Sequence, residues 1–337
     1  MSGNPDIIIS DAVTALGDGV ELVSSEKIKK GLNTLYRLEL DRYNEQTAIL
    51  KIYDFNDDSR YAQKELRLYK YLSEKTTIPV PGVLAAGIST TSSPPWILMT
   101  AIPGDEFNKT ELPSDEIVPS IINQAGKYLG ELHQKITFES YGRLEFSEES
   151  FQSSGCYQSW EEELESFIEM GTRGITNKRF SQYPDRVRTA MTELSPILKS
   201  DPTPVLMHQD YRLGNMIFEQ KQDGGQITGI LDWERSIPGH SEYDLCSSGY
   251  LLIDRLYSDS HLRRVLREEF FSGYCEEKPI PDSLASKKRF SLYRAVNILL
   301  LMRAFEDIWG TYDKSRQNEA ANRLLRDMED TLSNLPD

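Results

Sequence analysis

The chain has 337 residues, of which 39% are hydrophobic and 27% are charged, and its formal net charge is −15. This length and composition are typical of one large or two modest globular domains, and they exclude a largely disordered chain. The negative charge argues against a nucleic-acid partner, because proteins that grip the phosphate backbone present basic surfaces to it.

No segment indicates export or membrane insertion. Met1–Ser10 has no basic stretch followed by an apolar one, and the longest apolar run, Ile298–Met302, is far too short to span a bilayer. The three cysteines follow no recognisable spacing, so they predict reduced thiols and neither a disulfide framework nor a metal site. We therefore expect a cytoplasmic protein without a membrane partner, and the sequence leaves its oligomeric state open.

The first part of the chain, residues 1–102, predicts a β-rich unit with one helix. The helical pattern runs from about Tyr61 to Ser73. The stretch Ile102-Pro103-Gly104 has the residues of a break between two structural units. The expected strands are Lys27–Ile28, Leu35–Leu40, Thr47–Tyr53, Val83–Gly87 and Trp96–Ala101.

The second part, residues 103–337, predicts a mostly helical unit. Together the two parts indicate a mixed α and β protein with a boundary near residue 102. The expected helices are Ser114–Lys135, Tyr157–Glu169, Pro184–Leu194, Glu242–Leu256, Ser258–Tyr274, Pro281–Tyr312 and Ser315–Leu332.

A charged pair is predicted in the β-rich part. Lys51 lies in the apolar segment "TAILKIY", where a buried ammonium needs a negative partner. Glu65 shares a helical face with Leu68, Tyr69 and Leu72, so its carboxylate points inward among apolar neighbours. We predict that Lys51 and Glu65 form an ion pair that holds the lysine ready for an anionic phosphate. The alternative is that each is a rim charge with only its stem buried.

A turn upstream offers a second contact for phosphate. In "KGLNTLYRLEL", Gly31, Asn33 and Thr34 lie between two expected strands, where backbone N–H groups could face phosphate oxygens. One glycine and one Asx turn are common features, so this motif indicates a phosphate site only together with Lys51.

The segment "HQDYRLGN" precedes a predicted hairpin. Met216–Gln220 and Gln226–Leu231 are strand-like, and the "DGG" between them favours a tight turn, because glycine tolerates positive φ. The two ends of a hairpin lie side by side. Asn215 and Asp232 are therefore expected to meet at its open end, with Asp210 on the loop that leads in.

These three side chains predict a site for a hard cation. Two carboxylates and an amide offer oxygen ligands, and the group lacks the several histidines or cysteines that zinc favours. Mg²⁺ is therefore the expected metal. The alternative is a hydrogen-bonded loop that holds no ligand.

The motifs "HQDYRLGN" and "ILDWE" resemble those of a known family. They are similar to the catalytic-loop pattern His-x-Asp-x-x-x-x-Asn and the metal-binding pattern hydrophobic-Asp-Trp/Phe-Glu of the aminoglycoside phosphotransferase and choline kinase family, small-molecule relatives of the protein kinases. The resemblance runs from about Ile28 to Leu245. It implies that Asp210 is the catalytic aspartate, Asn215 the metal-binding asparagine and Asp232 the principal metal aspartate.

Other positions also match this family. Lys51 and Glu65 fall on its nucleotide lysine and the helix partner of that lysine. "GKYLGELHQ", with His133, resembles its Leu-x-x-Leu-His segment, and "GHSEYDL" places Asp244 on its structural aspartate. The chain departs from the family at His240, where an aspartate is usual.

The resemblance implies a bilobal, protein-kinase-like α+β fold. Residues 1–102 would form the nucleotide-binding lobe and residues 103–337 the catalytic and acceptor-binding lobe. The implied activity is transfer of the γ-phosphate of ATP, with Mg²⁺, to a hydroxyl of a small molecule. ATP is the default nucleotide, and the sequence leaves GTP open. Asp210 would align that hydroxyl and take its proton, and Lys51 would grip the phosphates.

Two rival functions need other residues. A metal-dependent phosphatase would use an Asp/His/Asn cluster around two metals, and the chain has only four histidines. A degenerate kinase that serves as a nucleotide-binding module would lack a catalytic or metal residue, whereas none is missing here. Both alternatives stay behind the kinase hypothesis.

The acceptor is the least defined part of the prediction. The segment "MRAFEDIWGTY" places Glu306, Asp307, Trp309 and Tyr312 near one another on the long helix expected over Pro281–Tyr312. Acidic and aromatic groups suit a cationic acceptor through charge pairing and cation–π contact. The alternative is that Trp309 belongs to the core and the acids form a solvated face.

Overall fold

The computed structural model describes residues 4–28, 33–44, 46–53, 58–88, 94–107, 112–146, 151–198, 202–222 and 224–335. It divides into two compact units, each built from three segments of the chain. The first unit comprises Met1–Glu131, Arg212–Arg235 and Glu268–Gly273, and the second comprises Leu132–Tyr211, Ser236–Arg267 and Tyr274–Asp337. The functional division expected at residue 102 stays a prediction.

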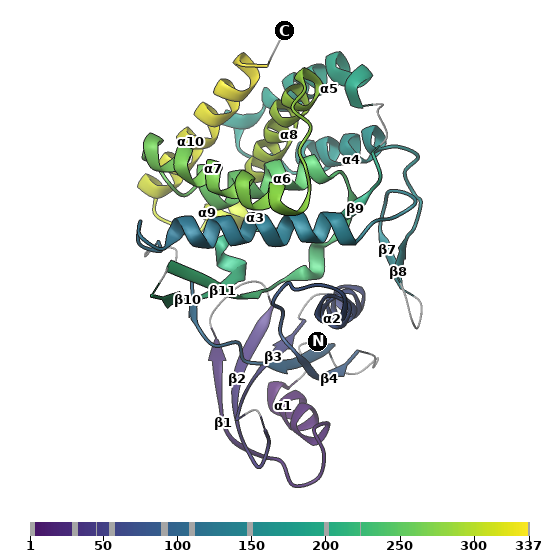
Figure 1. Ribbon diagram of the computed structural model, residues 1–337, viewed down its shortest axis with the longest axis vertical. Coiled ribbons are helices and arrows are strands. Elements are labelled where there is room, and N and C mark those ends of the chain that lie inside the picture. Colours follow the sequence, from purple (N-terminus) through teal and green to yellow (C-terminus); the bar gives the residue numbers. More distant parts are fainter. Residues whose placement is uncertain are drawn as a thin grey trace. The chain divides into compact units, whose positions relative to one another are not determined.

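A five-stranded antiparallel sheet lies at the centre of the first unit (Figure 1). Its strand order is β1-β2-β3-β5-β4, and each strand expected in this part of the chain is present. The first strand is much longer than the expected Lys27–Ile28. The prediction was too short because the side chains of this strand are exposed and lack the apolar alternation that reveals a half-buried strand. The strands are β1 (Glu21–Ile28), β2 (Thr34–Asp41), β3 (Thr47–Ile52), β4 (Val83–Gly87) and β5 (Trp96–Thr100).

Two helices contact opposite faces of this sheet. Alternate residues of a strand point to opposite faces, so Leu50 and Lys51 of β3 project to different sides. Leu50 packs with α1 (Pro5–Thr14), a helix that the sequence did not predict. Lys51 contacts Glu65 of α2 (Asp58–Lys75). The side of the sheet that carries Lys51 is therefore the side of α2.

A hairpin from the middle of the chain also belongs to the first unit. It consists of β10 (Met216–Lys221) and β11 (Gly224–Ile230), and β10 also pairs with the short β6 (Asp105–Glu106). Met216 pairs with Ile230 at the open end, and Gly224 has a φ of +128° at the turn. The hairpin prediction is confirmed, although its residue 223 lies outside the described residues.

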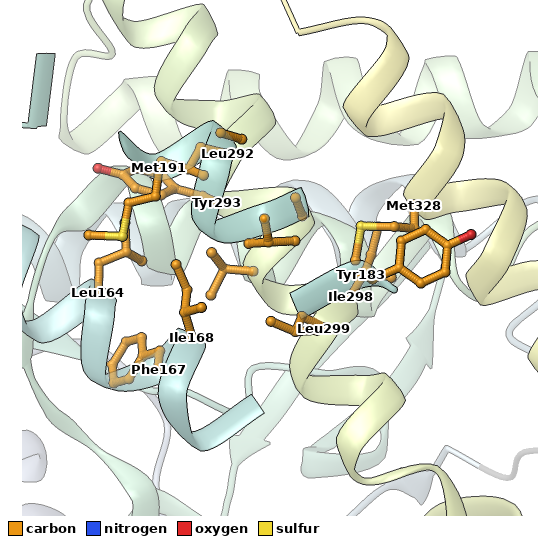
Figure 2. Close-up of a cluster of buried hydrophobic side chains, with 14 of the residues drawn as sticks. Leu164, Phe167, Ile168, Tyr183, Met191, Leu292, Tyr293, Ile298, Leu299 and Met328 are labelled. Atoms are coloured by element: carbon orange, nitrogen blue, oxygen red, sulfur yellow. The ribbon is translucent and has the colours of Figure 1, made fainter. Parts of the chain in front are cut away.

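The second unit is mostly helical, and α8 (Leu284–Arg303) contributes Leu292, Tyr293, Ile298 and Leu299 to its buried apolar cluster (Figure 2). Buried apolar residues surround α8 on most sides, which is typical of a helix packed between other helices. It contacts α4, α5, α6 and α10. Among the described residues, no helix has both the length and the apolar character needed to cross a membrane. The helices are α4 (Trp160–Arg173), α5 (Tyr183–Leu198), α6 (Ser241–Gly249), α8 (Leu284–Arg303), α9 (Phe305–Trp309), α10 (Lys314–Ser333) and the two ends of α7 (Ser260–Glu277), whose middle, Glu268–Gly273, belongs to the first unit.

Short elements complete the second unit. β9 (Val205–Met207) pairs with β12 (Ile237–Gly239), and β7 (Leu144–Phe146) pairs with β8 (Phe151–Ser153). The helix α3 (Val118–Lys135) passes from the first unit into the second.

Two helix predictions are wrong in their extent. The helix expected over Pro281–Tyr312 ends at Arg303, and α9 begins only after Ala304, whose ψ of 10° is not helical. The break lets Phe305 pack on Phe180, with ring centroids 5.4 Å apart. The helix expected over Glu242–Leu256 is likewise divided, into α6 and a π-helical turn at Tyr250–Asp254.

Candidate active site

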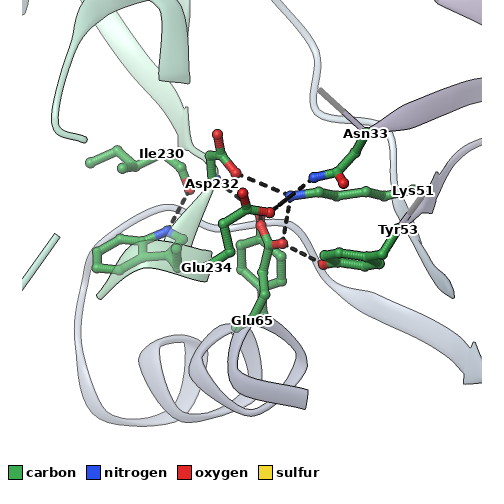
Figure 3. A network of polar contacts seen from close by, with 9 residues as sticks. Asn33, Lys51, Tyr53, Glu65, Ile230, Asp232 and Glu234 are labelled. Atoms are coloured by element: carbon green, nitrogen blue, oxygen red, sulfur yellow. Dashed lines mark hydrogen bonds and ion pairs between the residues drawn. The ribbon is translucent and has the colours of Figure 1, made fainter. Parts of the chain in front are cut away.

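Lys51 lies at the centre of a polar network in the first unit (Figure 3). Its side chain is 8% exposed, and its Nζ atom is 2.6 Å from Glu65 Oε2. The predicted ion pair is therefore confirmed. Burial alone would lower the pKa of Lys51, but the surrounding carboxylates outweigh it and hold this pKa well above its usual value. Lys51 is a fixed positive charge.

Glu65 is held in place by two tyrosines. Tyr69, one turn further along α2, donates its hydroxyl to Glu65 Oε1 at 2.7 Å, and Tyr53 donates to Oε2. Burial and the charge of Glu65 raise the pKa of both tyrosines, so both remain protonated donors. Because its side chain is fully buried, Glu65 has one orientation toward Lys51.

Two more carboxylates reach Lys51 from the turn after β11. Asp232 Oδ1 and Glu234 Oε2 each lie 3.0 Å from Lys51 Nζ. Asp232 has a φ of +68°, and its N–H faces the Tyr69 hydroxyl at 3.3 Å. Trp233 anchors the turn, because its indole N–H donates to the carbonyl of Ile230 at 3.0 Å and its ring is fully buried.

Glu234 is a site residue that the sequence interpretation missed. Asn33 Nδ2 donates to the Glu234 Oε2 atom at 2.9 Å, so this oxygen accepts from both Asn33 and Lys51. Burial raises the pKa of Glu234. Lys51 lowers this pKa, whereas the negative charges of Asp232 and Glu65 raise it further. The available signal was its place two residues after Asp232 in "ILDWE".

The expected phosphate turn is described only in part. Asn33 and Thr34 are half-buried, and Thr34 begins β2 opposite Ile52 of β3. Gly31 lies outside the described residues.

Asn215 lies at the open end of the hairpin as predicted, and the meeting of its side chain with that of Asp232 stays a prediction. The carbonyl of Asn215 accepts the N–H of Leu231 at 2.8 Å, so Asn215 lies across the open end of the hairpin from the residue before Asp232. Asn215 is 5% exposed, so it is a buried residue of this turn.

The carboxylates of this network fit a hard cation. One oxygen from each of Glu65, Asp232 and Glu234 lies within 4.8 Å of the others. Three carboxylates around the single ammonium of Lys51 leave an excess of negative charge. Oxygen ligands of this kind suit Mg²⁺. A divalent cation would offset the excess, so the residues present fit the expected metal.

Asp210 lies in the second unit, on a loop fixed by buried hydrogen bonds. Its N–H faces His208 Nδ1 at 3.3 Å. The N–H groups of His208 and Gln209 donate to the two oxygens of Asp244, at 2.9 and 3.2 Å. His208 is fully buried, which fits a residue that supports the loop. The meeting of Asp210 with Asn215 and Asp232 stays a prediction.

Asp244 receives a third hydrogen bond, from His133 of α3. The His133 Nε2 atom is 3.2 Å from Asp244 Oδ2, and its Nδ1 is 2.9 Å from the hydroxyl of Tyr274. In a neutral ring with its proton on Nε2, that nitrogen donates to Asp244 and Nδ1 accepts from the Tyr274 hydroxyl. Burial lowers the pKa of His133, which agrees with this neutral form.

His240, which departs from the family pattern, is part of an aromatic cluster in the second unit. Its ring stacks on Trp160 with centroids 5.8 Å apart, and its Nδ1 lies 3.5 Å from the Tyr293 hydroxyl. The residue is 4% exposed. Burial lowers the pKa of His240 to about 4. His240 is thus a packing residue that the fold keeps neutral.

The residues expected to form an acceptor pocket lie on and after α9. Glu306 and Asp307 are exposed, and the half-buried Trp309 packs on Phe305 with centroids 5.2 Å apart. The guanidinium of Arg255 lies 5.9 Å from the centre of the Trp309 ring. Tyr312 follows α9, and the guanidinium of Arg316 lies 5.7 Å from the centre of the Tyr312 ring.

The chain matches one family over most of its length. A model of the phosphotransferase enzyme family matches residues 27–285. A search among curated proteins gives no significant match.

Solved structures match nearly the whole chain. A candidate aminoglycoside phosphotransferase from Ralstonia eutropha has a TM-score of 0.65 at 16% identity, over 98% of this chain and 96% of its own. A candidate fructosamine-3-kinase from Haemophilus somnus has a TM-score of 0.60 at 17% identity, over 94% of this chain and 96% of its own. APH(2″)-IIa, in a ternary complex with streptomycin and ATP, has a TM-score of 0.56 at 15% identity, over 98% of this chain and 99% of its own. These likenesses confirm the expected kinase-like α+β fold, with a β-rich N-terminal part and a helical C-terminal part.

We predict that His240 makes the protein acid-sensitive. The unfolded chain protonates this histidine below about pH 6.5, whereas the folded chain resists protonation down to a pKa of about 4. Unfolding then takes up a proton, so the stability is fully present above pH 6.5 and is lost as the pH falls toward 4. Between pH 7 and 4.5 the free energy of unfolding should drop by roughly 2–3 kcal/mol from this group.

Urea unfolding of the wild type and of His240→Gln at both pH values measures this term. The variant should lack it, while His261→Asn, at an exposed histidine, should keep it. An identical pH dependence in the wild type and His240→Gln would show that His240 is not the titrating group.

Proposed function

Because the chain belongs to the phosphotransferase enzyme family, we propose that it transfers the γ-phosphate of ATP to a hydroxyl group of a small molecule. The observation that carries this proposal is the buried Lys51, fixed by Glu65 and surrounded by Asp232 and Glu234. In phosphoryl transfer a lysine of this kind grips phosphates, and nearby carboxylates hold the metal. The network combines both functions within one unit.

The phosphate-binding role is assigned to Lys51 and to the start of β2. Lys51 binds phosphate oxygens, and Glu65 holds its ammonium in place. The N–H groups of Asn33 and Thr34 are assigned to contacts with the phosphates. Gly31, which the sequence predicts to join them, lies outside the described residues. Backbone N–H groups in a turn form such an anion-binding concavity.

The metal-binding role is assigned to Asn215 and Asp232. Their oxygen atoms and the negative excess around Lys51 suit Mg²⁺. When bound, the metal neutralises charge that develops on the transferred group. Asp232 is oriented for this task by its turn, because Trp233 anchors the turn to Ile230.

The proton-accepting role is assigned to Asp210. Its carboxylate accepts a hydrogen bond from the acceptor hydroxyl, aligns it, and takes its proton as the new bond forms. His208 and Asp244 hold the loop that carries Asp210 through the hydrogen bonds described above. A rigid loop matters because misplacing the reacting oxygen slows the reaction strongly.

The rival functions fit less well. Among the described residues, the group suited to a metal consists of carboxylates without histidine, unlike a phosphatase site with a His-rich metal pair. A degenerate kinase would bind ATP without turnover, so a turnover assay separates it from the proposed enzyme. A cytoplasmic location remains part of the proposal.

The acceptor is proposed to be an amine-bearing hydroxyl compound. The chain is strongly acidic, and Glu306 and Asp307 are exposed beside the half-buried Trp309. Similar structures include complexes with the aminoglycosides streptomycin and kanamycin. Carboxylates and aromatic rings favour such cations.

For catalysis, we predict that Asp210→Asn lowers turnover by about two or more orders of magnitude, because it removes the proton acceptor. Nucleotide affinity should stay nearly unchanged, since the phosphate and metal residues are intact. Steady-state ATP consumption with the best acceptor and nucleotide calorimetry measure the two effects. Near-native turnover in this variant would show that Asp210 is not the proton acceptor.

For the metal, we predict that Asp232→Ala abolishes the tightening of ATP binding by Mg²⁺, because the main carboxylate ligand is lost. Calorimetry with and without Mg²⁺ measures this linkage. Glu219→Ala, which removes an acid from β10, is the control and should keep it. If Asp232→Ala retains the full Mg²⁺ effect, the metal lies elsewhere.

For the acceptor, we predict that amine-bearing hydroxyl compounds are phosphorylated faster than neutral ones. This preference should weaken as salt rises, because ions screen exposed charges. An acceptor screen by ATP consumption, repeated with Glu306→Gln and Asp307→Asn, tests it. Neutral sugars as the best acceptors, together with no effect of either variant, would contradict the acceptor class but leave the kinase proposal intact.

A further inference from the structure

We propose that Lys51 and Asn33 form a single phosphate-binding site, and that the carboxylate of Glu234 occupies this site as an internal competitor of the nucleotide. The inference rests on the proposed function, because it takes the ligand to be a nucleotide phosphate. It assigns a phosphate contact to the side chain of Asn33 and a gating role to Glu234.

Both donors converge on one carboxylate oxygen (Figure 3). Lys51 Nζ and Asn33 Nδ2 lie 3.0 and 2.9 Å from Glu234 Oε2. They come from neighbouring strands, since Asn33 directly precedes β2 and Lys51 pairs with Leu35 of that strand. An ammonium and an amide N–H aimed at one anionic oxygen are also the donors that a phosphate oxygen accepts from. The Glu234 carboxylate thus stands where a phosphate oxygen would bind.

Glu234 is the carboxylate of this network that can leave. Glu65 is fully buried and is fixed by two tyrosine hydroxyls. Asp232 is 33% exposed, but its backbone is fixed by a left-handed turn and by the contact of its N–H with Tyr69, and its short side chain keeps the carboxylate beside that backbone. Glu234 is 17% exposed, and in the described part of the chain its hydrogen-bond donors are Lys51 and Asn33. A phosphate that takes both donors therefore takes the partners of Glu234.

Charge also favours the exchange. Glu65, Asp232 and Glu234 already surround a single ammonium. A phosphate that entered while Glu234 stayed in place would add like charge within a few ångströms, and like charges at that distance repel strongly. Departure of Glu234 removes one of these charges as the phosphate arrives. Binding of phosphate and binding of the Glu234 carboxylate are therefore mutually exclusive at this site.

This role differs measurably from that of a simple metal ligand. If Glu234 only helped to bind a metal, its removal would not strengthen the binding of a metal-free anion. If it competes with phosphate, its removal frees Lys51 and Asn33 and strengthens that binding. Measurements in excess EDTA separate the two cases.

The experiment is calorimetric titration of ATP and of inorganic tripolyphosphate into the protein in EDTA. Glu234→Gln should lower the Kd of both by about tenfold, because a neutral amide competes for Lys51 less well than a carboxylate does. Glu219→Gln removes the same charge from β10 and should change Kd less than about twofold. The tripolyphosphate arm tests the site without requiring recognition of adenosine.

A second variant keeps the proposal open to disproof if Glu234→Gln fails to fold. Asn33→Ala removes one donor from a half-buried position and should weaken tripolyphosphate binding by roughly fivefold. In the double variant, the gain from Glu234→Gln should be smaller than in the wild type, because the two side chains share one hydrogen bond.

The outcomes are distinct. Tighter binding of tripolyphosphate in Glu234→Gln but not in Glu219→Gln supports the proposal. Unchanged or weaker binding in Glu234→Gln overturns it, as does unchanged binding in Asn33→Ala. If tripolyphosphate binds as expected but no acceptor is phosphorylated with Mg²⁺ and ATP, the proposed function fails while the phosphate site stands.

Discussion

Burial of the Lys51 ammonium is the constraint on which the first unit depends. A positive charge that is 8% exposed persists in a protein interior only with anions beside it. The chain supplies one anion locally, from Glu65 in α2, and two from Asp232 and Glu234, 181 and 183 residues further along. These ion pairs are among the contacts that join the segment Arg212–Arg235 to the compact unit of the N-terminal sheet. The ion pairs of Lys51 thus join segments that are far apart in the chain.

The parts of the site that the sequence predicted depend on local geometry. The helical spacing of Glu65 turned it inward, and hairpin chemistry placed Asn215 beside the strand that ends before Asp232. Glu234 could not be assigned in this way, because its partners Lys51 and Asn33 meet it only once distant segments have folded together. Tertiary contacts of this kind have no signature in residue spacing. The family resemblance supplied the role of Asp210, which composition and periodicity alone do not contain.

Physical causes explain why the sequence analysis did not predict certain helices and strands correctly. α1 is a short helix near the start of the chain, and it gains its stability by burying Ile8 and Ile9 against the sheet rather than from a long periodic pattern. The first strand is exposed, so backbone pairing with its neighbour defines it instead of apolar alternation. The break at Ala304 accompanies the packing of Phe305 on Phe180, a tertiary contact that local helix propensity does not record.

The backbone at Asp232 restricts how this protein can vary over evolutionary time. A φ of +68° is left-handed, and such a conformation costs most side chains about 1–2 kcal/mol, whereas glycine, asparagine and aspartate adopt it readily. Replacement by asparagine or glycine would keep the turn and lose the charge, while glutamate would keep the charge and strain the turn. A single substitution at this position can therefore keep the fold while it removes the carboxylate that we propose as the metal ligand.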